Sequence, residues 1–237
     1  MHSERTTARI VGVLFIVATA TAVMSDLLLR SLRDDPDYVA EFAANEGRVI
    51  LAALFEVSLA VAVVAIAVLL FPFLRRAHEG WALGYVGARI LEGTIVLAGG
   101  VSSLLLLTLS QEYVGSGGSD VTAFQASGVL LLEAREWTDS LGTTIVFGLG
   151  ALILYSLLYQ ARLVPGWLSV WGFVGAVMVL VAGLLRMYGE SPTSMTSILL
   201  TLPIGINEMV LAVWLIVRGF DSRRIVSEAP RRVMHGV

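Results

Sequence analysis

Two charged residues, Arg89 and Glu92, lie inside a long apolar run that extends from Trp81 to about Leu109. Moving a charged side chain into hydrocarbon is unfavourable unless the charge is paired or faces a hydrated interior. Residues three apart share one face of a helix, so this guanidinium and this carboxylate can meet. Such a pair could bind an anionic ligand, exchange a proton or a cation, or form an internal salt bridge.

Three further acidic residues lie within apolar runs, namely Glu56, Asp139 and Glu208. Among these runs we expect only Arg89 to be available to pair with the four carboxylates. Counting about 1.5 Å per residue from the ends of the runs, Glu92 and Glu208 come nearest the midplane of a membrane. Glu56 falls toward its outer third. Asp139 falls at its outer edge, in the first turn of a span, where a carboxylate suits the helix dipole.

Two interpretations of these charges remain open. In the first, they line a polar cavity in which Arg89 holds an anion, while Glu92 or Glu208 exchanges a proton or binds a cation. In the second, Arg89 forms a structural ion pair with Glu92, Glu56 or Glu208, and the pair fixes the register of the helices.

The residues that precede Glu208 bear on the backbone of its helix. Pro203, Gly205 and Asn207 could unwind the helix locally, and the freed carbonyl oxygens would then suit a small cation. The alternative is an ordinary proline kink whose backbone groups are satisfied by neighbouring helices.

The composition is that of a membrane protein. Of the 237 residues, 57% are hydrophobic and 15% are charged, and the mean hydropathy is +0.82. Soluble domains carry about 25% charged residues. Apolar runs of about 20 residues can cross a hydrocarbon core of roughly 30 Å. We therefore expect an all-α integral membrane helical bundle in one domain, 1–220, with six transmembrane helices at about 8–29, 49–74, 81–109, 137–160, 167–186 and 196–217.

The segments outside these spans carry most of the charge. Residues 30–48 form a charged loop in which Tyr38, Phe42 and Ala43 could make a short interfacial helix. Residues 121–136 predict a second short helix at the outer interface, before the fourth span. Residues 221–237 form an Arg-rich tail that we expect to be cytoplasmic and disordered.

The arginines predict the orientation of the bundle. With six spans, ten arginines fall on the side of the two termini and five on the other side. Because cytoplasmic loops carry the excess of basic residues, both termini are expected to be cytoplasmic.

Several classes of site are excluded by residue usage. The chain has no cysteine, and its histidines, His2, His78 and His235, all lie in terminal or loop segments. Thiolate chemistry and imidazole-held metal or haem within the membrane are therefore not expected, and we expect no cofactor and no metal ion. There is no lysine for a retinal Schiff base. No basic stripe with interleaved aromatic residues indicates nucleic acid.

Two kinds of hydrolase are also disfavoured. The segment Asp139–Thr144 offers hydroxyls and a carboxylate, but no span contains a histidine base and no Gly-x-Ser-x-Gly motif occurs. An aspartyl protease needs two facing aspartates. The candidates, Asp26 and Asp139, both lie at the outer edge.

Four motifs, in this order, resemble a bacterial family of multi-pass membrane proteins known as domain of unknown function 4386. They are Ala8–Phe15, Arg89–Glu92, the turn Leu163–Leu168, and Asn207-Glu208 followed by Leu211–Gly219. The resemblance covers about residues 8–220. It implies a bacterial plasma (inner) membrane protein with about six spans, and it supplies no catalytic residues. A histidine often precedes the fourth span in this family, where this chain has Glu136–Asp139.

The first functional hypothesis is a non-enzymatic bundle whose polar intramembrane cavity binds or transports a small-molecule, ion or lipid-like ligand. An alternative is an accessory or regulatory membrane subunit that contacts a membrane protein partner or a second copy. A third is a lipid-modifying enzyme with Glu92 or Glu208 as acid/base. The candidate ligand-binding or ion-coupling residues are Arg89, Glu92, Glu56, Glu208, Asn207 and Asp139.

Overall fold

The computed structural model describes residues 2–117 and 121–221, and in these ranges the chain forms helices and no strand. This confirms the all-α helical bundle. The helices are α1 (His2–Arg33), α2 (Tyr38–Ala44), α3 (Glu46–Leu74), α4 (Glu79–Gly115), α5 (Val121–Thr138), the π-helix η1 (Asp139–Val146), α6 (Phe147–Ala161), α7 (Gly166–Met187) and α8 (Met195–Val217).

Within the described residues, six helices are long and apolar enough to cross a membrane: α1, α3, α4, the continuous helix α5–η1–α6, α7 and α8. Many of their large apolar side chains are exposed, including Leu54, Val61 and Leu202. Such surface suits lipid tails, and a helix satisfies its own backbone hydrogen bonds in hydrocarbon. These features indicate a multi-pass membrane protein.

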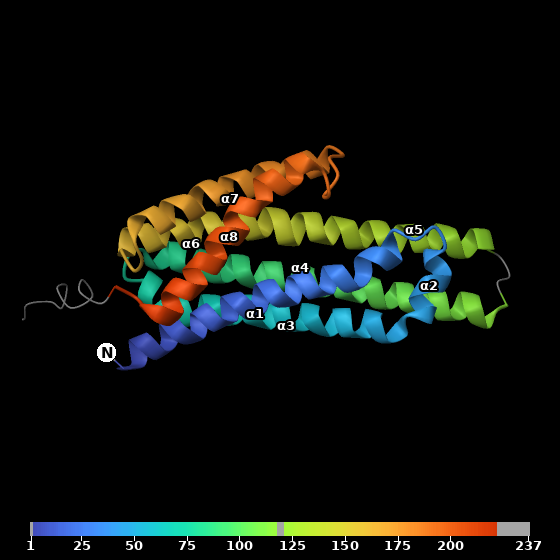
Figure 1. Cartoon of the computed structure of the whole chain (residues 1–237), viewed down its shortest axis with the longest axis horizontal. Helices are drawn as coiled ribbons and strands as arrows, with labels where there is room; N and C mark the ends of the chain where they lie inside the picture. The colour runs from blue at the N-terminus through green and yellow to red at the C-terminus, as the bar shows by residue number, and fades with distance from the viewer. Residues whose placement is uncertain (1, 118–120, 222–237) are drawn as a thin grey trace, which may run out of the picture.

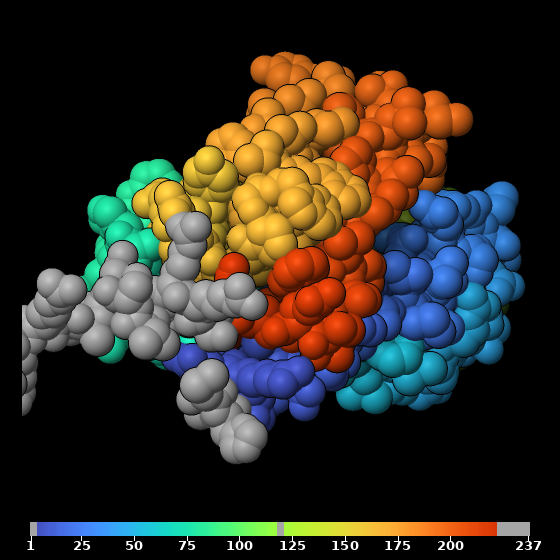
Figure 2. All heavy atoms as spheres, turned by 60° about the vertical axis from the view of Figure 1, so that its left-hand side comes forward, coloured from blue at the N-terminus to red at the C-terminus, as the bar shows by residue number. Residues whose placement is uncertain are grey.

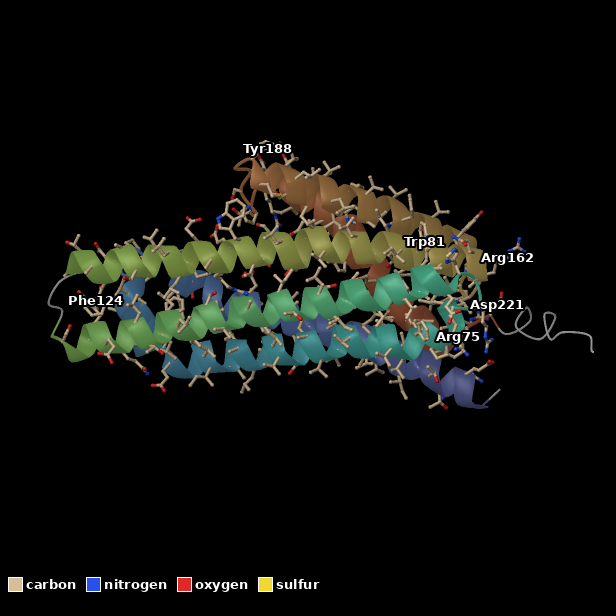
Figure 3. The ribbon with its side chains drawn as sticks, turned by 180° about the vertical axis from the view of Figure 1, so that it is seen from behind. Arg75, Trp81, Phe124, Arg162, Tyr188 and Asp221 are labelled. Carbon is tan, nitrogen blue, oxygen red and sulfur yellow. The ribbon has the colours of Figure 1, made fainter. Side chains whose placement is uncertain are left out.

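The helices run roughly along one long axis, with α1 and α3 on one side of α4 and α7 on the other, while α8 crosses from α7 at one end to α1 at the other (Figure 1). The N-terminus and the end of α8 lie together at what we call the terminal end. Figure 3 shows Arg75, Arg162 and Asp221 at this end and Phe124 at the opposite, distal end. The turn at Tyr188, which joins α7 to α8, lies between the two ends, well short of the distal one (Figure 3).

The helices differ in length in a way that places the membrane. The 22 residues of α7 extend about 33 Å, close to a hydrocarbon thickness of roughly 30 Å. The 37 residues of α4 extend about 55 Å. Because both start near the terminal end, the last turns of α4, together with α5 and α2, extend beyond the layer that α7 can span. We call this part the distal extension.

The distal extension is held together by side chains of α2. The Ala43 amide donates a hydrogen bond to Ser110 Oγ of α4 at 2.7 Å, and the Tyr38 hydroxyl donates to the Gln125 carbonyl of α5 at 3.1 Å. Burial raises the pKa of the Tyr38 phenol. Phe42 lies in a small core with Leu29, Leu106 and their neighbours. The short helix expected around residues 38–43 is thus present, and it packs on protein.

The segment 121–136 is helical, as expected, and it continues through η1 into α6 as one helix. Nothing in Glu136–Asp139 interrupts a helix, because the segment has neither proline nor glycine. Asp139 therefore does not stand at a helix N-terminus, and the helix-dipole argument for its position is wrong.

At the terminal end the chain closes on itself. The Asp221 amide donates a hydrogen bond to the Leu163 carbonyl at 2.9 Å, and the Phe220 and Phe73 rings lie 4.6 Å apart. Apart from Asp221, the tail expected at 221–237 lies outside the described residues.

Two helices approach closely at this end, at Gly12 of α1. A Cβ atom at Gly12 would lie 2.6 Å from the Ala212 carbonyl oxygen and 2.8 Å from Ile216 Cγ1 of α8. Glycine at this position lets the two helix backbones pack directly, as small residues do between membrane helices.

We expect Gly12→Ala to lower the free energy of unfolding by about 1–3 kcal/mol, because the new methyl group must displace the α8 backbone. Gly205→Ala is the matched control, since nothing lies within 4 Å of the position that its methyl group would take. Thermal unfolding in detergent measures both. Equal stability of the two variants would contradict the close approach of α1 to α8.

Candidate functional site

Arg89 and Glu92 form an ion pair within α4. Arg89 Nη1 lies 2.7 Å from Glu92 Oε2, and the two side chains are only 3% and 6% exposed. The Arg89 Nε–H also donates to the Tyr85 hydroxyl at 3.3 Å. The guanidinium lies 5.1 Å from the centre of the Phe147 ring, within cation–π distance. The pairing expected from the three-residue spacing is therefore formed, on the buried face of α4.

Glu208 reaches the same region from α8. It lines a cavity of about 170 Å³, which we call the central cavity, together with Arg89 and Glu92. Arg89 lies close enough to act on the Glu208 carboxylate electrostatically. Among the described residues, however, Glu208 has neither a hydrogen bond nor an ion pair. The guanidinium of Arg89 forms its ion pair with Glu92. Glu208 is therefore the carboxyl group of this cavity that has no ion-pair partner among the described residues.

The rest of the central cavity wall is mainly apolar. Phe15 and Ala18 of α1, Val63 of α3 and Phe147 of α6 contribute to it. The hydroxyls of Thr19 and Thr143 are its remaining polar groups. Two carboxyl groups and one guanidinium in an apolar chamber can exchange a proton, hold a small cation or orient a polar group of a ligand.

Asn207 does not join this cavity. It is fully buried, and its Nδ2 donates a hydrogen bond to the Leu168 carbonyl of α7 at 3.0 Å. The backbone of α8 remains α-helical from Met195 to Val217 with Pro203 inside it. The local unwinding considered for Pro203, Gly205 and Asn207 is therefore not observed. Asn207 instead joins the middle of α8 to the start of α7.

Glu56 of α3 pairs with a residue that the sequence did not suggest. Its Oε1 lies 2.5 Å from Arg135 Nη2 of α5 and accepts a hydrogen bond from Ser25 Oγ of α1 at 2.9 Å. The expectation that only Arg89 could pair with the buried acids is wrong. Arg135 reaches Glu56 because α5 packs along α4 and its guanidinium lies against Gly99, inside the bundle.

Two glycines of α4 make room for this pair. A Cβ atom at Gly100 would lie 2.6 Å from Glu56 Oε2, and one at Gly99 would collide with the Arg135 guanidinium. Adjacent glycines in a membrane helix allow a neighbour to approach closely, and here the neighbour is an ion pair. The two glycines could have shown where on α4 a neighbouring group packs, but they could not have shown that this group is Arg135.

Asp139 pairs with Arg186 of α7. Arg186 Nη1 lies 3.5 Å from Asp139 Oδ2 and donates a hydrogen bond to Thr144 Oγ1 at 3.0 Å. Both partners belong to η1, whose wider π-helical turns are frequent at functional sites. No pattern in the sequence predicted this π-helix.

These distal ion pairs line a second cavity of about 330 Å³, which we call the distal cavity. Asp26, Arg30 and Arg33 of α1 complete its charged wall. The two cavities share five lining residues: Ala22, Val23, Leu59, Val96 and Thr143. They are therefore neighbours, and the candidate residues Glu56 and Asp139 lie at one of them while Arg89, Glu92 and Glu208 lie at the other.

A comparison with protein families agrees with the sequence motifs. The model of the family "domain of unknown function (DUF4386)" matches residues 10–219. The chain belongs to this family. No curated protein and no solved structure matches it.

The match to DUF4386 includes every residue of the two cavities. In the described residues of this DUF4386 chain, no group of three or more histidine, aspartate or glutamate side chains is placed to hold a metal ion. The chemistry available at the site is that of carboxyl, guanidinium and hydroxyl groups.

The buried pair of this DUF4386 chain should be strongly coupled. Arg89→Gln leaves the Glu92 carboxylate buried without its partner, so the free energy of unfolding should fall by about 3–5 kcal/mol. The double variant Arg89→Gln/Glu92→Gln removes both charges and should recover most of the loss. Thermal unfolding of the singles and the double in detergent measures the coupling. Additive losses would show that the pair does not stabilise the bundle.

Gly100→Ala tests the second pair. The added methyl group must displace the Glu56 carboxylate from α4, so we expect a loss of about 1–3 kcal/mol in the free energy of unfolding. Gly87→Ala on the same helix is the control, because a methyl group there would have nothing within 4 Å. If both variants unfold at the wild-type temperature, Glu56 is not held against Gly100.

Proposed function

We propose that this DUF4386 chain is a non-enzymatic helical bundle that binds or transports a small or lipid-like ligand, with Glu208 as the group that exchanges a proton or a cation. The observation that carries the proposal is the lack of an ion-pair partner for Glu208 among the described residues, in a cavity beside the paired Arg89 and Glu92. A carboxyl group kept in such a position costs stability, as residues retained for function often do.

The structural interpretation explains Arg89 and Glu92 but not Glu208. If the charges served only to fix helix register, one guanidinium and one carboxylate would be sufficient. The extra carboxyl group lines a chamber large enough for several atoms, so it has access to a ligand or an ion that enters.

The set of polar groups favours binding over covalent chemistry. The central cavity is lined by carboxyl groups, one guanidinium and two threonine hydroxyls, Thr19 and Thr143. A nucleophile needs an adjacent base that is itself oriented by a third group. The paired Glu92 and the isolated Glu208 do not form such an arrangement with either threonine.

We further propose that the protein lies in a bacterial plasma membrane with both termini in the cytoplasm. The support is the distribution of arginines along the sequence, ten on the side of the termini against five on the other. Of the ten, six belong to the described residues: Arg5, Arg9, Arg75, Arg76, Arg162 and Arg218. The four arginines of the C-terminal tail that contributed to this prediction lie outside the described residues.

A second candidate function is that of an accessory subunit, and the distal extension favours it. Gly128 is the buried residue of α5. Val129 and Leu130 are exposed on the same helix, beyond the layer that α7 spans. A protein partner could cover this surface. Co-purification of one stoichiometric partner from native membranes would support this candidate, and a clean monomer would contradict it.

We expect Glu208→Gln to retain the fold, with an unfolding temperature equal to or above that of the wild type, because it removes a half-buried acid that has no ion-pair partner among the described residues. The same variant should lose the flux of protons or sodium ions that the wild type supports in liposomes with an imposed gradient. Glu112→Gln, at an exposed position near the end of α4, is the control. Identical flux in wild type and Glu208→Gln for both ions would refute the assignment of Glu208.

A further inference from the structure

The distal cavity carries more positive than negative charge. Its lining includes four arginines and three acids: Arg30, Arg33, Arg135, Arg186, Asp26, Glu56 and Asp139. Each acid is already paired, and Asp26 is shared by Arg30 at 3.7 Å and Arg33 at 2.6 Å. With all groups ionised, the lining therefore has one positive charge in excess.

The arginines also carry more hydrogen-bond donors than the protein uses. A guanidinium has five N–H donors on three nitrogens. The contacts of each of these four arginines with described residues involve a single nitrogen. The Nε atoms of Arg135 and Arg186 are buried and have no acceptor among the described residues. These two Nε atoms are out of reach of any molecule in the cavity, so the donors open to a ligand are the remaining Nη groups of the arginines that line it, and a group with several acceptor oxygens suits them.

The depth of the cavity matches a lipid head group. Arg186 lies in the last turn of α7, the helix whose length fits the hydrocarbon thickness. The guanidinium groups of Arg186 and Arg135 therefore lie at the level where lipid phosphates begin. Arginine binds phosphate oxygens in a planar, two-pronged geometry, which makes it well suited to this depth.

Part of the lining of this cavity is also on the apolar outer surface, because Val23 and Leu27 of α1 are 51% and 58% exposed. Pro192 of the α7–α8 connection lines the cavity as well. In Figure 2, α8 lies between α7 and α1, and Figure 1 shows that it diverges from α1 toward the distal end. An apolar groove between α1 and α8, lined by Thr19, Leu202 and Ile206, follows this divergence. Thr19 also lines the central cavity, so the groove lies beside the central cavity, which in turn shares five lining residues with the distal cavity.

We propose that the distal cavity binds the phosphate-type anionic head group of an amphiphile, whose apolar chain lies in the groove between α1 and α8. The proposal rests on the ligand-binding function proposed above and names the class of ligand. The excess positive charge and the unused guanidinium donors select the head group. The apolar residues of α8 accept the chain, and the central cavity with Glu208 lies next to the bound head group.

The test compares head groups on one acyl chain. Full-length protein in detergent is titrated with dioleoyl phosphatidic acid, with dioleoyl phosphatidylcholine, or with inorganic phosphate alone, and binding is followed by thermal shift and native mass spectrometry. We expect phosphatidic acid to bind at least about tenfold more tightly than phosphatidylcholine, because hydrogen bonds between charged groups are the strong ones. Inorganic phosphate should bind far more weakly, because it lacks the chain.

Two arginine variants and one matched control locate the site. Arg186→Gln and Arg30→Gln should each reduce the preference for phosphatidic acid by about tenfold. Arg30 is 49% exposed and only 3.7 Å from Asp26, so its variant should fold even if Arg186→Gln does not. Arg76→Gln is the control, because Arg76 is 50% exposed, lies 3.9 Å from Glu4 and belongs to the terminal end. It should keep the wild-type preference.

Each outcome is decisive. Equal binding of the two lipids, or a preference unchanged in both Arg30→Gln and Arg186→Gln, overturns the anionic head-group site while leaving the function proposed for Glu208 intact. Binding of inorganic phosphate as tight as that of phosphatidic acid overturns the amphiphile. A head-group preference that is kept in Glu208→Gln, with no ion flux in the wild type, supports the distal site and contradicts the ion-coupled function.

Discussion

Hydrocarbon offers no water to solvate a charge, and this constraint organises the whole bundle. Every ionised group between the helices must pair with another protein group or face a hydrated cavity. Arg89 forms an ion pair with Glu92, three residues further along the same helix. Glu208 has no such partner among the described residues and lines the cavity beside this pair. The balance of charges in the centre is therefore incomplete by one carboxyl group, and the proposed function depends on this imbalance.

Charged groups of the distal cavity form ion pairs between different helices. Glu56 on α3 meets Arg135 on α5, and Asp139 on η1 meets Arg186 on α7. These contacts need space, which Gly99 and Gly100 of α4 provide by having no side chain. They also hold the helices around an open volume. Ion pairs of this kind stabilise little beyond their desolvation penalty, but they set the positions of guanidinium groups that remain free to bind an anion.

Helix length connects these two regions to the membrane. The short α7 ends where the distal arginines lie, while α4 and α5 continue into the distal extension. The central cavity then falls inside the hydrocarbon layer and the distal cavity at its edge. A ligand with an anionic head and an apolar chain matches this arrangement, because its two parts prefer the same two environments. Shared residues such as Thr143 of the π-helix bring the two environments into contact.

By itself the sequence determined what depends on local properties. Hydropathy and run length predicted the all-α membrane bundle, and the spacing of Arg89 and Glu92 predicted their pairing, because residues three apart in a helix meet regardless of the rest of the fold. The adjacent Gly99 and Gly100 likewise permit a close neighbour, because small residues let membrane helices approach each other. Only the tertiary structure decided that Arg135 pairs with Glu56 and that Asn207 donates a hydrogen bond to α7. It also decided that Glu208 has no ion-pair partner among the described residues. Those contacts join segments far apart in the chain, so they depend on how the helices pack, and no local pattern encodes that packing.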